Sequence, residues 1–84
     1  MSIHDGHRQR LRERFLREGL DNFDELQVLE LLLFYCVPRQ DTNPMAHALL
    51  ERFGSLAQVL EADPAELRKV PGIGDNAATF LSLV

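Results

Sequence analysis

Apolar residues recur along this chain at the three- and four-residue spacing of amphipathic helices, and no segment alternates long enough to form a strand. The pattern predicts helices at about 6–18, 24–36 and 44–53, a short connecting helix at 55–62, another from Asp63, and a last one at 75–84. Capping residues mark three of the starts, namely Asp24 with Gln27, Ser55 with Gln58, and Asp63 before Pro64. We therefore expect an all-α fold, a compact bundle of five or six short helices.

The segment from Leu26 to Phe34 is the most apolar part of the chain and has almost no polar face. A helix that is apolar on every side is buried, so we expect the other helices to pack around this one. Glu30 interrupts the segment, and a buried carboxylate needs a partner. We expect that partner to be an arginine of the first helix.

Length and composition indicate one small domain. The chain has 84 residues, of which 45% are hydrophobic and 26% charged, as is usual for a soluble globular protein. The longest apolar run, 31–37, is too short to cross a bilayer, and the N-terminal segment lacks a hydrophobic signal region. The single cysteine, Cys36, fits a reducing compartment. We therefore expect a cytoplasmic protein with no membrane partner. Because the last helix has no C-cap, we also expect the chain to be part of a longer protein.

Charge is distributed unevenly along the sequence. Residues 1–17 hold five arginines and two acidic residues, a net charge of +3, whereas the rest carries −7 and the whole chain −4. An acidic whole argues against a dedicated, high-affinity DNA-binding protein. Arg10, Arg14 and Arg17 form one stripe on the first helix. The stripe is either an edge that faces phosphates, through Arg10 and Arg14, or a solvated face whose arginines partly pair with acidic helices.

A faint internal repeat relates two parts of the chain. The segments "LLLFYCVPRQDTNPMAHALL" and "AELRKVPGIGDNAATFLSLV" both have the order helix, Val-Pro turn, helix with small residues in its first turn. With one residue inserted in the first turn, Ala46 aligns with Ala78 and Leu49 with Leu81. The repeat predicts two pseudo-symmetric helix-hairpin-helix units within the bundle.

The segment "LRKVPGIGDNAATFL" resembles a helix-hairpin-helix motif, with matches at Leu67, Val70, Gly72, Ile73, Gly74 and Ala78. Through "GHRQRLRERFLREGL", "ELLLFYCVPRQDTNPMAHALLERFGSL" and "VPGIG", nearly the whole chain resembles the N-terminal domain of the RadC family, also called UPF0758. The resemblance implies a SAM/RuvA domain 2-like arrangement in a DNA-repair protein. It also implies a C-terminal JAB/MPN-like domain with a metal-binding His-x-His signature, which this sequence lacks.

The turn "VPGIGDN" is suited to hold a phosphate through its backbone. Glycine adopts positive φ and has no Cβ, so Gly72 and Gly74 can turn their amides outward while Ile73 fills the space between the helices. We expect Gly72 or Gly74 to have positive φ or a close backbone contact, so that Gly74→Val would cost a few kcal/mol of stability. The alternative is that the glycines only allow the helices to pack closely.

Side chains around this turn weaken the phosphate interpretation. Asp75 suits the positive end of the following helix and is a candidate cap, but its carboxylate repels phosphate. Asn76 is neutral and can donate a hydrogen bond. The other Val-Pro turn offers Arg39 together with Asp41. The candidate DNA-binding residues are Gly72, Ile73, Gly74, Asn76, Arg39, Arg10 and Arg14.

No catalytic or metal-binding pattern is present in the sequence. His4, His7, His47 and Cys36 do not have zinc-site spacing, and no Ser-His-Asp set, acid-base pair or phosphate-binding P-loop occurs. We expect no cofactor and no enzymatic activity. Two functions therefore remain: a non-catalytic module that binds the DNA backbone without reading sequence, and a protein-interaction or scaffolding domain in which the hairpins are purely structural.

Overall fold

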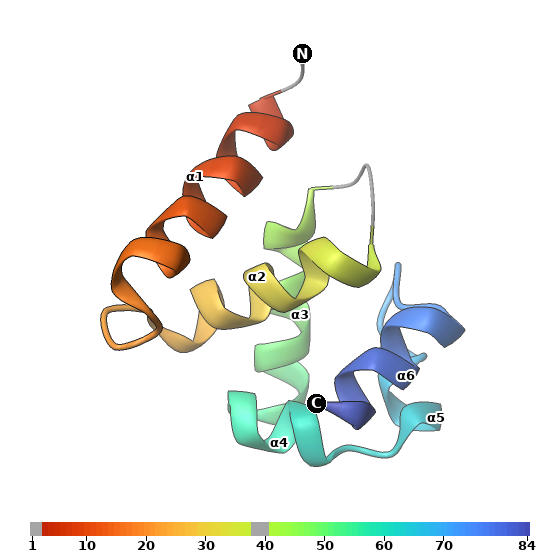
Figure 1. Ribbon diagram of the computed structural model, residues 1–84. Helices are drawn as coiled ribbons and strands as arrows, with labels where there is room; N and C mark the ends of the chain where they lie inside the picture. The colour runs from red at the N-terminus through yellow and green to blue at the C-terminus, as the bar shows by residue number, and fades with distance from the viewer. Residues whose placement is uncertain (1–2, 38–40) are drawn as a thin grey trace.

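The structure is a computed structural model that describes residues 3–37 and 41–84. Over these residues it contains six helices and no strand, which confirms the all-α prediction. The helices are α1 (Ile3–Glu18), α2 (Glu25–Cys36), α3 (Thr42–Phe53), α4 (Leu56–Glu61), α5 (Pro64–Leu67) and α6 (Asp75–Leu83) (Figure 1). Helix α3 begins earlier than predicted because Asp41 caps it, and Pro44 in its first turn needs no amide donor. Helix α5 is only a single turn.

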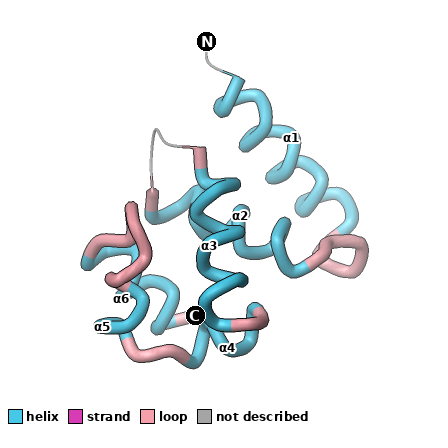
Figure 2. The backbone as a smooth tube through the Cα atoms, turned by 180° about the vertical axis from the view of Figure 1, so that it is seen from behind, coloured by secondary structure: helices cyan, strands magenta, loops and turns pink. Residues whose placement is uncertain are grey.

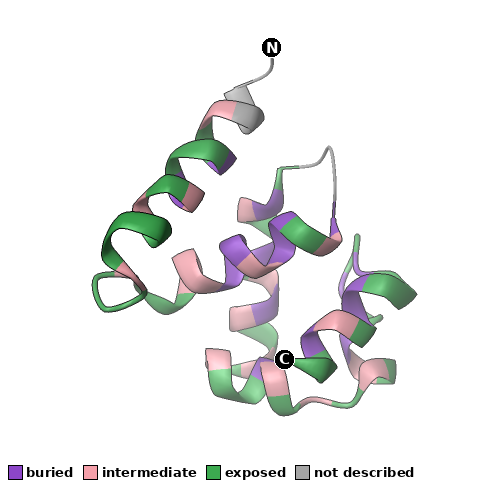
Figure 3. Cartoon of the chain, in the orientation of Figure 1, coloured by how far each residue is buried: buried purple, intermediate pink, exposed green. Residues whose placement is uncertain are grey.

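Helix α2 is the central helix, as its apolar sequence predicts. It packs against α1, α3, α4 and α6, and its Leu29 and Leu33 are completely buried. Buried positions follow α2 and the neighbouring parts of α3 and α6 (Figure 3). The main core consists of Leu29, Leu33, Val37, Met45, Ala46, Leu49, Val59, Leu67, Val70, Ile73, Ala77, Ala78 and Leu81. Burial of these apolar side chains holds the hairpin formed by α5 and α6 against the end of α2.

The helix starts predicted from local sequence are capped as expected. Asp24 and Gln27 each accept a hydrogen bond from the other's backbone amide, a reciprocal capping box. Ser55 Oγ accepts from the amide of Gln58 at 3.2 Å, and Asp63 Oδ1 caps the first turn of α5. A cap of this kind stabilises a helix by about 1 kcal/mol. Capping residues therefore fix where these helices begin.

Helix α1 stands beside the rest of the bundle and packs chiefly on α2 (Figure 2). A second, smaller apolar cluster joins the two helices and consists of Leu11, Leu31 and Phe34 with Phe23 packed against them. Arg8 is buried at the same contact, where it donates to the carbonyls of Phe34 at 3.2 Å and Val37 at 2.7 Å. These carbonyls lie at the C-terminal end of α2, where a positive charge is favourable.

Glu30 is buried, but the predicted arginine partner is wrong. Its Oε2 lies 3.0 Å from Nε2 of His7 in α1. Its Oε1 accepts a hydrogen bond from Nδ2 of Asn43 in α3 at 3.3 Å. The residue is only 3% exposed. Arg8, the neighbouring arginine, is directed instead to the carbonyls that end α2. The carboxylate thus ties α1 and α3 to the central helix through a histidine and an amide.

The residues that the internal repeat aligns are equally buried. Ala46, Leu49, Ala78 and Leu81 are all completely inaccessible to solvent. The alignment therefore pairs positions of the same environment. The pseudo-symmetric arrangement of two helix-hairpin-helix units stays a prediction.

Candidate nucleic-acid interface

The turn between α5 and α6 has the backbone that the sequence predicts, with one correction. Ile73 is buried and fills the space between the helices, and its amide donates to the carbonyl of Val70 at 3.0 Å. Gly72 has a φ of 91°, so this position needs glycine. Gly74 has a φ of −97°, and a Cβ added there would meet nothing within 4 Å. The expected cost of Gly74→Val is therefore wrong, because the strain lies at Gly72.

The first turn of α6 presents backbone amides that donate no hydrogen bond to any described residue. Gly74 is the N-cap residue in an extended conformation, and no side chain caps the helix. The first bond into the helix runs from the amide of Ala78 to the carbonyl of Gly74 at 3.0 Å. Over residues 3–37 and 41–84, the amides of Gly74, Asp75, Asn76 and Ala77 have no acceptor. Such amides at a helix N-terminus carry partial positive charge and suit an anion.

An open hollow of about 340 Å³ lies over these amides. It is lined by Cys36, Val37, Gly72, Gly74, Asp75, Asn76 and Ala77. Cys36 and Val37 come from the end of α2, so the hollow depends on the packing of α2 against the hairpin. Partial burial raises the pKa of the Cys36 thiol, and its Sγ donates to the carbonyl of Leu32 at 3.7 Å. The thiol is therefore a neutral wall of the hollow at pH 7.

Asp75 is the first residue of α6 and does not cap it, contrary to the expectation from sequence. Its carboxylate is 88% exposed and lies 3.5 Å from Nε of Arg68, which follows α5. An exposed pair of this kind contributes only about 0–1 kcal/mol, so an incoming phosphate can compete for Arg68. The pairing offsets part of the repulsion that Asp75 exerts on an anion.

Two further basic side chains lie near the start of the turn and share one carboxylate. Lys69 Nζ lies 3.2 Å from Glu66 Oε1, and Nη2 of Arg52 in α3 lies 3.1 Å from Glu66 Oε2. The hydrogen bond from Lys69, followed by that from Arg52, lowers the pKa of Glu66. From Asp63 onward the hairpin carries two cations and three carboxylates, and Arg52 of α3 adds one positive charge beside Glu66, so the charges around the turn balance within an acidic chain.

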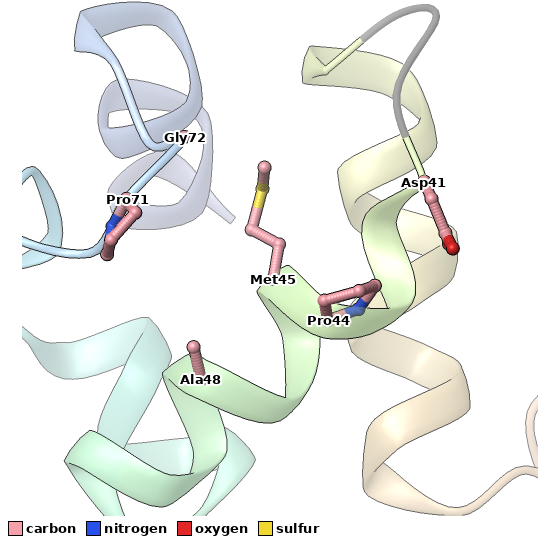
Figure 4. A pocket seen from close by; sticks show the side chains of 6 residues that line it. All are labelled: Asp41, Pro44, Met45, Ala48, Pro71 and Gly72. Atoms are coloured by element: carbon pink, nitrogen blue, oxygen red, sulfur yellow. The ribbon is translucent and has the colours of Figure 1, made fainter.

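A second hollow separates the turn from α3. It measures about 390 Å³ and is lined by Asp41, Pro44, Met45, Ala48, Pro71 and Gly72. Met45 points from α3 into the space below the turn that carries Pro71 and Gly72 (Figure 4). The start of α3 and the α5–α6 turn therefore face a common space. Arg39, the candidate from the other Val-Pro turn, lies outside the described residues.

The arginines of α1 are not brought to this hairpin. Helix α6 packs against α5, α2 and α4, and α2 and α3 separate it from α1 (Figure 1). Arg14 lies over the ring of Phe23, 4.6 Å from its centroid, and donates to the carbonyl of Asn22. Arg10 is exposed and has no hydrogen bond or ion pair with any described residue. The structure therefore brings together Gly72, Ile73, Gly74 and Asn76, and leaves Arg10 and Arg14 on another part of the surface.

Other site types find little support in the described part of the chain. Over residues 3–37 and 41–84, no three histidine, cysteine, aspartate or glutamate side chains gather where they could hold a metal ion. Among the same residues, no helix combines the length and apolar character that a membrane span requires.

Four residues around the amides, namely Arg68, Lys69, Tyr35 and Cys36, were not predicted as part of the site. Arg68 and Lys69 precede the turn in "ELRKVPGIG", and this basic pair was a readable signal. Tyr35 and Cys36 lie beside α6 only because α2 packs there, so no local pattern could have placed them.

Comparison with known proteins places the chain in a family. The UPF0758 N-terminal family model matches residues 5–79. A UPF0758 protein of Fusobacterium nucleatum is 49% identical over 79 residues, which cover 94% of this chain and 34% of that protein. A UPF0758 protein of Rhodobacter capsulatus is 46% identical over 74 residues, covering 88% of this chain and 35% of that protein. The chain thus spans about a third of the length of these curated relatives. No solved structure matches the chain. From the match over residues 5–79, the chain belongs to the UPF0758 family and corresponds to its N-terminal part.

Proposed function

We propose that this chain is a non-catalytic module that binds the phosphate backbone of DNA, through the hairpin of α5 and α6, without reading sequence. The observation that carries the proposal is the first turn of α6, where the amides of Gly74 to Ala77 have no acceptor among the described residues. Gly72 and Gly74 place no side chain over these amides. A phosphate oxygen accepts hydrogen bonds from such a turn without contact to any base, so binding is independent of sequence.

The expected binding is weak. The chain has a net charge of −4, and Asp75 beside the amides is acidic. One to three phosphate contacts give a slope of about −1 to −3 in a plot of log affinity against log salt concentration. A Kd of about 10⁻⁴ to 10⁻⁶ M at physiological salt follows from non-specific contacts of this kind. In the longer relatives we propose that this module brings a C-terminal JAB/MPN-like domain to DNA during repair.

The substitution Gly74→Ser tests the proposal with opposite effects on folding and on binding. Gly74 has φ and ψ of −97° and −167°, close to the −84° and 172° of Asp24, which caps α2 through its side chain. A serine hydroxyl at this position accepts a hydrogen bond from one amide of the first turn, that of Asn76 or Ala77. We expect Gly74→Ser to stabilise the fold by a few tenths of a kcal/mol and to weaken DNA binding, because the hydroxyl occupies one of the phosphate donors.

Gly74→Ala is the matched control, since it adds a Cβ in open space and leaves the amides free. Affinities of both variants and of the natural chain are measured by fluorescence anisotropy with duplex, branched and single-stranded DNA over a range of salt concentrations. If Gly74→Ser binds DNA as tightly as Gly74→Ala, the amides of α6 are not the phosphate site.

A protein-interaction or scaffolding domain is the second candidate, and a specific observation favours it. Large apolar side chains are exposed at Phe15, Leu16, Leu20, Tyr35 and Leu83. Exposed apolar surface of this kind is typical of contacts with other proteins. Under this function the glycines only allow α5 and α6 to pack closely. The absence of DNA binding at low salt, in the natural chain and in Asp75→Lys alike, would favour it over the DNA-binding module.

A further inference from the structure

Tyr35, in the last turn of α2, has an exposed ring beside the hairpin. Its side chain belongs to the most apolar helix, yet the residue is 65% exposed. Its hydroxyl has no hydrogen-bond partner among residues 3–37 and 41–84. An open hollow of about 550 Å³ lies next to it, a size that holds a small organic ligand or one unit of a polymer. The hollow is lined by Tyr35, Cys36, Asp75, Asn76, Thr79, Phe80 and Leu83.

This hollow adjoins the one over the α6 amides. Both are lined by Cys36, Asp75 and Asn76. One surface therefore offers backbone donors at one end and the apolar faces of Tyr35 and Phe80 at the other. A ligand that satisfies both ends carries an anionic group next to a flat, largely apolar ring. A nucleotide with an unpaired base has this composition, and successive units of a single strand repeat it.

Duplex DNA can contact the backbone donors at one end of this surface but not the aromatic rings at the other. Its phosphates are accessible, but its bases are stacked inside the helix and cannot lie on a protein ring unless a base pair opens. Among the described residues that line the hollow, Asp75 is the only acidic one, and its ion pair with Arg68 at 3.5 Å offsets part of its charge. Aromatic rings beside a phosphate-binding track are the usual means by which proteins hold single strands without reading sequence.

We propose that this surface takes single-stranded nucleic acid in preference to duplex, with a phosphate on the first turn of α6 and the adjacent base stacked on Tyr35. The inference rests on the proposed function, because it needs the phosphate site, and adds a preferred form of nucleic acid and a residue that selects it. Loss of one stacked base weakens binding by roughly 5- to 150-fold.

The test compares a labelled single-stranded oligonucleotide with its duplex, by fluorescence anisotropy at low salt. We expect Tyr35→Ala and Tyr35→Leu to weaken single-strand binding by about 5- to 150-fold while duplex binding is unchanged. Tyr35→Phe keeps the ring and retains the affinity. Leu16→Ala is the control for loss of exposed apolar surface, because Leu16 is 80% exposed on α1, away from the hairpin. We expect it to change neither affinity.

Cys36 provides a second readout, as the only cysteine of the chain and a lining residue of both hollows. A bound single strand is expected to slow alkylation of Cys36 in the natural chain, and to do so much less in Tyr35→Ala at the same oligonucleotide concentration. Circular dichroism of each variant verifies that the fold is intact. If Tyr35→Ala itself disturbs the fold, the comparison of Tyr35→Leu with Tyr35→Phe decides between ring and bulk.

The outcomes separate this inference from the proposed function. Equal affinity for single strand and duplex, unchanged in Tyr35→Ala and Tyr35→Leu, overturns the stacking role and leaves the phosphate site standing. Absence of binding to either form refutes both proposals. Equal losses in Tyr35→Phe and Tyr35→Leu show that the ring face is not the contact, and these also overturn the inference.

Discussion

The two glycines of the α5–α6 turn are predicted to differ sharply in their tolerance of a side chain. Gly72 has a φ of 91°, and an L-residue in a left-handed conformation costs about 1–2 kcal/mol. Replacing glycine by alanine also lowers the conformational entropy of the unfolded chain, which stabilises the fold by about 0.4–1 kcal/mol. The net expectation for Gly72→Ala is a destabilisation of about 1 kcal/mol. In a domain of this size, that lowers the melting temperature by about 4–8 °C.

Gly74→Ala is expected to be nearly neutral. The φ of Gly74 is −97°, and its added Cβ meets nothing within 4 Å. The gain of about 0.4–1 kcal/mol from the unfolded chain offsets the poorer capping by alanine, which is of similar size. Thermal melts and urea titrations, both followed by circular dichroism, measure the two variants side by side. If Gly74→Ala is as destabilising as Gly72→Ala, or if Gly72→Ala has no effect, the assignment of strain to Gly72 is wrong.

Two substitutions at the contact between α1 and α2 give further predictions, each measured as the free energy of unfolding in urea. Glu30→Ala removes, from a buried position, the carboxylate that accepts a hydrogen bond from Asn43, and should destabilise the fold by about 1–3 kcal/mol. A change within about ±0.5 kcal/mol, as is usual for surface substitutions, would contradict the buried contact. Arg8→Ala removes the donor to two carbonyls at the end of α2 and should destabilise the fold by about 1.5–3 kcal/mol. Arg10→Ala, at an exposed position on the same helix, should change the free energy of unfolding by no more than about 0.5 kcal/mol. Equal effects of the two substitutions would mean that the contacts of Arg8 do not stabilise the fold.

The sequence predicted those parts of the fold that local chemistry determines. Asp24, Ser55 and Asp63 cap their helices through bonds to amides two or three residues ahead, so the pattern alone marks these starts. The burial of α2 followed from its lack of a polar face. The exact partner of Glu30 did not follow, because His7 and Arg8 are adjacent and only the seating of α1 on α2 decides which one reaches the carboxylate.

The candidate site shows the same division. The motif "VPGIG" located the turn and its exposed amides but contains both glycines, so it could not decide which of them has positive φ. The sequence favours Asp75 as a cap and as a repulsive charge, whereas in the structure the side chain of Arg68 pairs with it across the turn. Tyr35 and Cys36 are distant in sequence from α6, and only tertiary packing makes them part of the surface.

The most direct test of the phosphate site is an amide NMR titration of isotope-labelled protein with short single-stranded and duplex DNA at low salt. The account predicts that the amide signals of Gly74, Asp75, Asn76 and Ala77 shift together and saturate, and that Gly74→Ser needs a higher DNA concentration for the same shifts while its spectrum remains that of a folded domain. If DNA shifts signals elsewhere, for example along α1, and leaves those four amides unmoved, the first turn of α6 does not bind phosphate.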